Sequence, residues 1–196
     1  RPPRSTLFPY TTLFRSIVLS GPSGVGKGTV AKRLVEKNKD LALSISYTTR
    51  APRKGEENGK DYFFTTREDF DNKISQNGFL EYSNHFDNFY GTPKQFVKDK
   101  LENNDVLLEI DVNGGLQVKN NFPDAVLILL LPPNKEELTR RLVERNTETE
   151  DKIKARLLRL DYEMEMERLY DYSVVNDDLE TAVNEIESII EKEKNR

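Results

Sequence analysis

The chain has 196 residues, enough for one domain with a sizeable core, and its formal net charge of −4 excludes a generic polycation for nucleic-acid backbones. The absence of cysteine excludes a disulfide framework and a thiolate metal site, and the single histidine argues against a histidine metal site or a Ser-His triad. The longest apolar run, 125–131, is far too short to cross a bilayer. We therefore expect a soluble cytoplasmic enzyme with no nucleic-acid partner and no membrane contact.

The beginning of the chain fits no regular element. Residues 1–15 repeat the letters TLF, contain three prolines and show no helix or strand periodicity. We interpret this stretch as a disordered or non-native arm and leave it out of the fold argument.

The first interpretable element is a strand that leads into a glycine-rich loop. Residues 16–20 (SIVLS) are apolar and β-rich, and from Lys27 onward apolar residues such as Val30 and Leu34 recur at helical spacing. Between them, SGPSGVGKGT nearly fits the phosphate-binding pattern G-x-x-x-x-G-K-[ST]. Gly28 occupies the position where the pattern has a hydroxyl that ligates magnesium. The alternative, a glycine-rich turn with an incidental lysine, does not explain the succession of strand, loop and helix.

The loop predicts an ATP phosphate site. Its glycines let backbone amides point inward, and these amides form a cradle for anions together with the positive end of the following helix. Lys27 adds a point charge that reaches the transferred phosphate. Because Gly28 has no hydroxyl, we expect Mg²⁺ to be held mainly by phosphates and water, with help from Thr29 or Asp111. The predicted ATP-binding residues are Gly21, Pro22, Ser23, Gly24, Val25, Gly26, Lys27, Gly28 and Thr29.

Segment 44–92 interrupts this rhythm of strand and helix. It contains alternating and aromatic-rich pieces, such as SISYTT and DYFFTT, separated by turn residues such as Asn58-Gly59. We interpret it as a small, partly antiparallel insertion of mixed α/β structure. On a phosphate-loop core, such a module is expected to bring the second substrate.

The rest of the chain returns to alternating strands and helices. Near-continuous apolar runs predict strands covered on both faces, and charged stretches with apolar residues at helical spacing predict helices. The predicted strands are 106–110, 125–131 and 172–175, and the predicted helices are 136–145, 151–170 and 179–192. This order predicts an α/β fold with a mainly parallel sheet flanked by helices. Glu109 and Asp111 lie at a strand's carboxyl end, where ligands bind, although Asp111 also fits a cap at the loop start.

Five further segments make the sequence recognisable. They are SYTTRAPR (46–53), GKDYFF (59–64), FLEY (79–82), FYGT (89–92) and EID (109–111). In this order, and together with the phosphate loop, they closely resemble the guanylate kinase family, whose members phosphorylate GMP with ATP. The resemblance covers nearly the whole chain from Ser16 onward. Glycine after the loop lysine also occurs in relatives of this class.

The resemblance implies a GMP site in the insertion. Glu81 matches the acid that reads guanine, because one carboxylate accepts from both N1–H and N2–H₂, whereas adenine would leave it unpaired. Ser46 and Thr92 match the hydroxyl donors to O6. Arg50 and Arg53 match a phosphate clamp, although an arginine pair by itself also fits a solvated turn and Glu81 a surface acid. The implied GMP-binding residues are Ser46, Arg50, Arg53, Tyr62, Glu81, Tyr90, Thr92, Glu109 and Asp111.

The resemblance also implies a lid whose arginines close over ATP and exclude water. Because phosphoryl transfer depends on alignment and charge neutralisation, we expect no single essential general base. Arg140 has no matching position, and a solvated helix face is the better interpretation for it. The implied catalytic residues are Lys27, Arg50, Arg141, Arg145 and Arg156.

The implied domain order is a core (16–43), the GMP-binding insertion (44–92), a core (93–135), a helical lid (136–160) and a core (161–196). Two positions depart from the family pattern. Asn146 follows the lid arginine where glycine is usual, and asparagine tolerates the left-handed backbone that a turn there needs. Asn113 stands where the family commonly has glutamine, so we assign it no contact.

The leading hypothesis is an ATP:GMP phosphotransferase of purine nucleotide metabolism that also accepts dGMP, uses Mg²⁺ and acts as a monomer or homodimer. Two alternatives stay open. A catalytically inactive guanylate-kinase-like binding module would tend to lose the phosphate loop, and the intact Lys27 loop argues against it. A monophosphate kinase specific for AMP or UMP would conflict with the guanine-reading role of Glu81.

Overall fold

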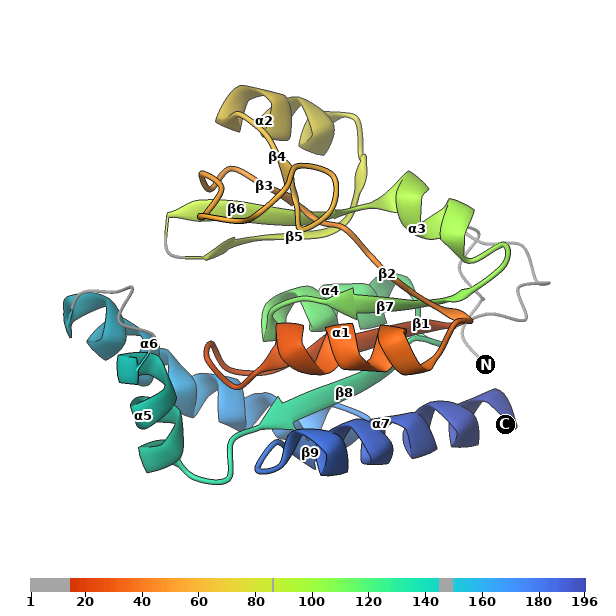
Figure 1. The fold of residues 1–196 in the computed structure, drawn as a ribbon. Helices are drawn as coiled ribbons and strands as arrows, with labels where there is room; N and C mark the ends of the chain where they lie inside the picture. Colours follow the sequence, from red (N-terminus) through yellow and green to blue (C-terminus); the bar gives the residue numbers. More distant parts are fainter. Residues whose placement is uncertain (1–14, 86, 145–149) are drawn as a thin grey trace.

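The computed structural model describes residues 15–85, 87–144 and 150–196, which contain two sheets (Figure 1). The larger sheet consists, in spatial order, of β2 (Leu41–Leu43), β7 (Asp105–Glu109), β1 (Ser16–Ser20), β8 (Val126–Leu131) and β9 (Tyr172–Val175). The smaller sheet consists of β4 (Phe63–Phe64), β3 (Tyr47–Thr48), β6 (Asn88–Pro93) and β5 (Phe79–His85). Most of the predicted arm, residues 1–14, lies outside the described residues.

All strand pairs in the larger sheet are parallel, which confirms the predicted α/β fold class. Strand β1 lies in the middle, with Ile17 opposite Leu107 on one side and opposite Val126 on the other. Because these strands run in the same direction, their carboxyl ends meet at one edge of the sheet. The glycine-rich loop leaves β1 at this edge.

Helices cover both faces of the larger sheet (Figure 1). On one face, Ile17 and Leu19 of β1 pack with residues of α1 (Lys27–Lys37) and α7 (Leu179–Lys194). On the other face, Val18 packs with residues of α3 (Lys94–Lys100) and α4 (Val112–Asn121). This double cover explains why the strands are apolar at nearly every position. Within the described ranges, none of the helices has the length and apolar composition needed to traverse a membrane.

The smaller sheet and α2 (Arg67–Ser75) form a separate layer, which we call the small lobe (44–92). Strands β3 and β4 are parallel, whereas β6 is antiparallel to both β3 and β5, which confirms the predicted mixed insertion. Phe70 of α2 is fully buried, and its ring centroid lies 4.5 Å from that of Phe79.

Helix α4 holds the small lobe against the larger sheet through side-chain amides. Gln117 accepts from the Tyr82 amide (3.3 Å) and donates to the Tyr82 carbonyl (3.0 Å). Asn121 donates to the carbonyl of Leu80 (3.1 Å). These bonds fix β5 relative to the carboxyl edge of the larger sheet.

Several boundaries differ from the sequence-based expectations. Strand β7 covers Asp105–Glu109 rather than 106–110, and β8 starts at Val126 rather than at residue 125. The predicted helix 151–170 is wrong at its carboxyl end, because α6 (Glu150–Glu165) gives way to a 3₁₀ turn, η1 (Met166–Leu169). The tighter turn accompanies burial of Met166 in the core.

Other elements were found where expected or were not predicted at all. Strands β1 and β9 have the predicted bounds, α5 covers Lys135–Glu144, and α7 extends to Lys194. The predicted end of α5 at Arg145 lies outside the described residues. The sequence analysis does not predict β2, α3 or α4. The first two are short, and α4 contains Gly114 and Gly115, which lower helix propensity.

We expect burial of α1 against the larger sheet to contribute strongly to stability. Leu34 of α1 is fully buried, so Leu34→Ala should lower the free energy of unfolding by about 2–5 kcal/mol. The matched control is Leu158→Ala on α6, where the side chain is 82% exposed and the change should stay within about 0.5 kcal/mol. Chemical denaturation measures both, and similar losses in the two variants would contradict this description of the core.

Candidate active site

The loop after β1 has the backbone of an anion cradle. Gly24 and Gly26 have φ values of 89° and 101°, in the region that favours glycine. Gly26 is also the N-cap of α1, so the first amides of this helix point toward the loop. A Cβ atom on Gly26 would lie 2.6 Å from Asn176 Nδ2, so a side chain there would displace Asn176. Glycine at this position is therefore part of how the cradle forms.

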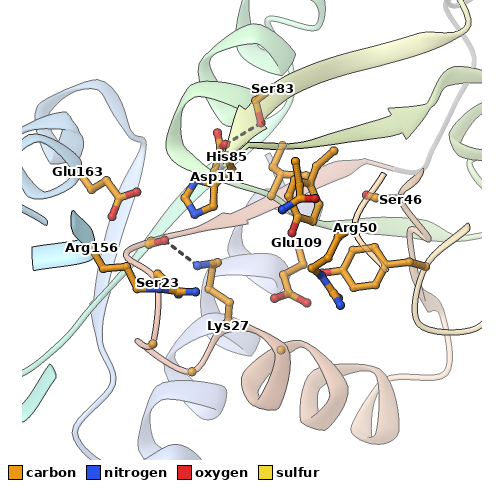
Figure 2. Close-up of a pocket in the computed structure, with 18 of the residues that line it drawn as sticks. Ser23, Lys27, Ser46, Arg50, Ser83, His85, Glu109, Asp111, Arg156 and Glu163 are labelled. Atoms are coloured by element: carbon orange, nitrogen blue, oxygen red, sulfur yellow. Dashed lines mark hydrogen bonds between the residues drawn. The ribbon is translucent and has the colours of Figure 1, made fainter. Parts of the chain in front are cut away.

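Two cations lie on the loop. Lys27 Nζ donates to the carbonyl oxygens of Gly21 (2.7 Å) and Pro22 (3.1 Å). Arg156, which comes from α6, donates to Ser23 Oγ. Figure 2 shows Lys27 and Arg156 approaching the loop from different elements. Backbone amides and two positive charges at one loop are what phosphate binding needs.

Asn176 supports the loop from behind. Its side chain is buried, and Nδ2 donates to the carbonyl of Val25 (2.7 Å). Its own carbonyl accepts from Arg141 Nη1 (3.0 Å), and Arg141 Nε donates to Glu137 Oε1 (2.7 Å). Arg141 thus links α5 to the residue that supports the loop.

Glu109, the last residue of β7, faces the start of α1. A Cβ atom on Gly28 would lie 3.5 Å from Glu109 Oε1, an ordinary van der Waals contact. The glycine after the loop lysine is therefore not required by packing, because a Cβ atom would fit beside this carboxylate. Burial raises the pKa of Glu109, and the charge of Lys27 opposes that shift.

Asp111 follows β7 and combines two roles. Its Oδ1 caps α4 by accepting from the Gly114 amide (2.8 Å), and its Oδ2 accepts from Ser83 Oγ of the small lobe (2.6 Å). Arg159 of α6 lies 3.9 Å from Oδ2 and also bonds Glu163 Oε1 (3.0 Å). Asp111 therefore lies where α4, α6 and the small lobe meet.

Glu81 is a buried acid at the inner end of the small lobe, only 4% exposed. Its Oε1 accepts from Thr92 Oγ1 (2.6 Å) and from the Thr92 amide (3.1 Å), which fixes the orientation of the carboxylate. Ser46 Oγ lies 3.5 Å from Thr92 Oγ1. Burial raises the pKa of Glu81 to about 7, although the Thr92 hydrogen bonds lower it.

Arg50 and Arg53 lie in the loop between β3 and β4. Glu56 accepts from Arg50 Nη1 (3.0 Å) and Nη2 (2.9 Å), and the Arg50 guanidinium carbon lies 5.4 Å from the Tyr62 ring centroid. The rings of Tyr62 and Tyr90 are 6.0 Å apart. Burial raises the pKa of Tyr62 to about 12, so its phenol stays a hydrogen-bond donor at neutral pH.

A cavity of about 580 Å³ joins these groups, with Lys27 and Arg50 on its wall (Figure 2). It lies between the phosphate loop and the small lobe. The predicted site residues that line it are Gly21, Ser23, Gly24, Gly26, Lys27, Gly28, Ser46, Arg50, Arg53, Tyr62, Glu81, Tyr90, Glu109, Asp111 and Arg156. The structure describes five other predicted residues that do not line it, namely Pro22, Val25, Thr29, Thr92 and Arg141. Arg145 lies outside the described residues.

The comparisons with known proteins agree with this geometry. A family model for guanylate kinase matches residues 14–193. The chain belongs to the guanylate kinase family. A guanylate kinase from Caldanaerobacter subterraneus subsp. tengcongensis is 51% identical over 181 residues, which cover 92% of this chain and 88% of that protein. A guanylate kinase from Oceanobacillus iheyensis is 50% identical over 177 residues, which cover 90% and 86%.

Solved structures give the same result. The crystal structure of guanylate kinase from Anaplasma phagocytophilum matches with a TM-score of 0.80 and 34% identity, covering 95% of this chain and 89% of that one. Membership in the guanylate kinase family makes the chain a nucleotide-binding kinase. Of the two departures from the family pattern, Asn146 lies outside the described residues, and Asn113 accepts from Tyr162 Oη (2.7 Å), which joins α4 to α6.

Sequence reasoning missed several residues that line the cavity in this guanylate kinase family member. They are Ser83, His85, Asn88, Ile110, Leu142 and Glu163. Ser83 and His85 alternate with Glu81 along β5, so the two-residue period of a strand would have found them once Glu81 was placed. Burial, together with the charge of Arg159, lowers the pKa of His85 to about 4, so the imidazole is neutral at pH 7.

We expect Glu81 to make stability fall as the pH rises. Its pKa is 4.5 as an ordinary glutamate and about 7 in the fold, so between these values the folded state holds the proton more tightly than the unfolded state. Glu81→Gln cannot ionise, so the loss of unfolding free energy between about pH 5 and pH 8 should shrink by about 1–3 kcal/mol.

Urea denaturation at both pH values measures this difference. Glu68→Gln, at an exposed position on α2, is the matched control and should keep the wild-type pH dependence. If Glu81→Gln also kept it, the raised pKa of Glu81 would be refuted.

Proposed function

We propose that this chain transfers the γ-phosphoryl group of ATP to GMP, and also to dGMP, giving ADP and the guanine nucleoside diphosphate. The observation that carries the proposal is the cavity shared by Lys27 on the phosphate loop and by Glu81 and Arg50 of the small lobe. A donor nucleotide with its phosphates on the loop would meet, end to end, an acceptor whose base lies at Glu81. The family match and the curated relatives support the same reaction.

The donor end of the site consists of charges and backbone donors. We assign the loop amides and Lys27 to the ATP phosphates, and Arg156 to closure of the loop from α6, in keeping with its bond to Ser23. Arg141 and Arg145 complete the proposed set of lid arginines. Phosphoryl transfer leaves the protein little covalent chemistry, so the rate depends on in-line alignment and charge neutralisation, and no residue is assigned as a general base.

The acceptor end reads guanine through a fixed carboxylate. Glu81 accepts from the N1–H and N2–H₂ donors of guanine, and Thr92 holds the carboxylate in place by its two hydrogen bonds. Ser46 supplies a hydroxyl for O6, whereas Thr92, predicted for the same contact, donates its one hydroxyl proton to Glu81 and does not line the cavity. Adenine presents an acceptor at N1, so an AMP acceptor would set a lone pair against this buried carboxylate in place of a donor, which costs about 1–3 kcal/mol.

Magnesium fits this site as an ion held mainly by phosphates and water. Among the described residues, no group of three or more His, Cys, Asp or Glu side chains is arranged to hold a metal ion. Thr29 is exposed and outside the cavity lining, whereas Glu109 and Asp111 line it and are suited to orient metal-bound water. When bound, the ion would neutralise charge on the phosphates.

The proposed division of labour follows the layers of the fold. Segment 44–92 binds GMP, segment 136–160 acts as the lid, and segments 16–43, 93–135 and 161–196 form the core. The cytoplasmic location and the choice between monomer and homodimer stay predictions. A scaffold module that only binds peptides does not need a lysine on the phosphate loop. The intact loop, in which Lys27 donates to the Gly21 and Pro22 carbonyls, therefore favours the kinase.

An acceptor screen at fixed Mg-ATP tests this function. Wild-type protein should turn over GMP, while AMP and UMP should give about 100-fold lower kcat/KM. Glu81→Gln should lower kcat/KM for GMP by about 10–100-fold with little change in the KM for ATP, because an amide offers guanine a donor where it needs an acceptor. Glu68→Gln is the control for removal of an acid from the small lobe. Equal wild-type turnover of AMP and GMP would refute the guanine assignment, and absence of turnover would refute the kinase assignment.

Lys27 should act on the transition state more than on nucleotide binding. Lys27→Gln removes the charge at the loop, so kcat should fall by about 100–1000-fold. Lys32→Gln, on the exposed face of the same helix, should leave kcat unchanged. Steady-state kinetics with GMP and ATP measures both variants. Near-normal kcat in Lys27→Gln would contradict the role assigned to this loop.

A further inference from the structure

The loop that carries the arginine clamp also carries an acid, Glu56, with no role in the proposed function. Its carboxylate pairs with the end of the Arg50 guanidinium, Oε1 with Nη2 (2.9 Å) and Oε2 with Nη1 (3.0 Å). Its Oε2 also accepts from the Arg53 amide (2.7 Å). One carboxylate therefore contacts both clamp residues.

Glu56 is itself fixed in place. The Glu56 amide donates to the Arg53 carbonyl (3.1 Å), while the Arg53 amide donates to the Glu56 side chain, so the two residues close a turn on each other. The Glu56 and Arg50 side chains are only 20% and 14% exposed. Burial acts to raise the pKa of Glu56, but the bonds from Arg50 and Arg53 outweigh it and keep the pKa below its ordinary value. The acid is thus ionised at neutral pH and held from two sides.

The pairing decides which edge of Arg50 remains for a ligand. A guanidinium has five N–H donors. In Arg50, two of these donors bond to Glu56 and a third bonds to the Ala51 carbonyl (2.8 Å). The other two, on Nε and on the outer side of Nη2, lie parallel on one edge of the group, which is the fork that grips a phosphate in two places. The Tyr90 side chain also hydrogen-bonds Arg50, so a bound phosphate would meet the guanidinium together with this phenol. Arg50 lines the cavity together with Tyr62 and Tyr90.

We propose that Glu56 is a positioning residue for the acceptor phosphate: it holds Arg50 by the end of the guanidinium so that the side edge faces the phosphate of the bound nucleotide. This inference rests on the proposed function. It assigns Glu56 no contact with the substrate. Its effect on catalysis is to fix the direction from which the acceptor phosphate oxygen meets the donor.

A different role for the same acid predicts the opposite sign. If Glu56 competed with the phosphate for Arg50, or only repelled it, loss of its charge would tighten nucleotide binding. If Glu56 positions Arg50, loss of one arm of the fork weakens binding even though a negative charge near the phosphate has been removed. The turn shared with Arg53 favours positioning, because its two hydrogen bonds would keep Glu56 in place when a phosphate binds to Arg50.

Calorimetric titration of Glu56→Gln with GMP and with guanosine separates these roles. The amide keeps the size of the side chain and one acceptor but loses the charge and the two-armed pairing. We expect the dissociation constant of GMP to rise about tenfold and kcat to fall, because a charge-assisted bond is lost. Guanosine lacks the phosphate, so its affinity should not change. Glu56→Asp restores a carboxylate and should recover part of the loss.

The neighbouring residue supplies the matched control. Glu57 lies in the same loop, is exposed and pairs with Lys60 Nζ (3.3 Å), so Glu57→Gln removes the same charge without touching the clamp. It should leave both affinities and kcat unchanged. Unchanged or tighter GMP binding in Glu56→Gln would overturn the proposal, and so would an equal loss of guanosine affinity, which would mean general damage to the lobe. Failure of the proposed function is a separate result, namely wild-type protein that binds GMP no better than guanosine or does not turn it over.

Discussion

The parallel pairing of β1 between β7 and β8 is the constraint on which the site depends. Leu19 lies opposite Glu109 in this register, so the glycine loop and the acids after β7 leave the sheet side by side. On the far side, the Asn176 amide donates to the Leu131 carbonyl (2.8 Å), which brings the end of β9 beneath the same loop. Three chain segments that are distant in sequence therefore meet at one edge. The apolar core on both faces of the sheet holds that edge in place.

Acidic and basic side chains lie close together around the cavity. Burial makes the charged form of either kind of side chain unfavourable. Burial raises the pKa values of Glu81, Glu109 and Glu163, so each of these acids opposes folding once it is ionised. The cations are held by the protein's own acceptors, as with Arg50 on Glu56 and Lys27 on loop carbonyls. Such pairs contribute little net stability when buried, but they fix direction. The site is therefore better explained by nucleotide binding than by stability of the fold.

Local sequence patterns predicted the parts of the structure that depend on local physics. The phosphate loop, β1 and β9 follow from glycine spacing and short apolar runs, and their bounds were predicted closely. The predicted end of α6 was wrong. The 3₁₀ turn that follows α6 accompanies burial of Met166, a tertiary effect that helical periodicity does not reveal. Glu56 lies in KGEENGK, where an acid looks like any solvated turn residue. Its role becomes visible only in the fold, where the Arg50 guanidinium pairs with its carboxylate.

The segment after β7 shows how the two halves of the site constrain each other. Helix α4 contains Gly114 and Gly115 in its first turns, each of which costs about 1 kcal/mol of helix stability relative to alanine. A Cβ atom on Gly114 would lie 2.5 Å from Glu81 Oε2, and one on Gly115 would clash with Tyr170 Oη. The glycines thus let Glu81 pack directly on the helix that Asp111 caps.

This close approach explains why α4 was missed and why its sequence still forms a helix. Its low propensity is offset by the Asp111 cap at one end and by the Gln117 and Asn121 bonds to β5 further along. The same bonds attach the small lobe to the larger sheet, so the distance between Glu81 and the phosphate loop depends on α4. A bulkier residue at position 114 would therefore displace Glu81 from the cavity wall, although Gly114 itself does not line the cavity.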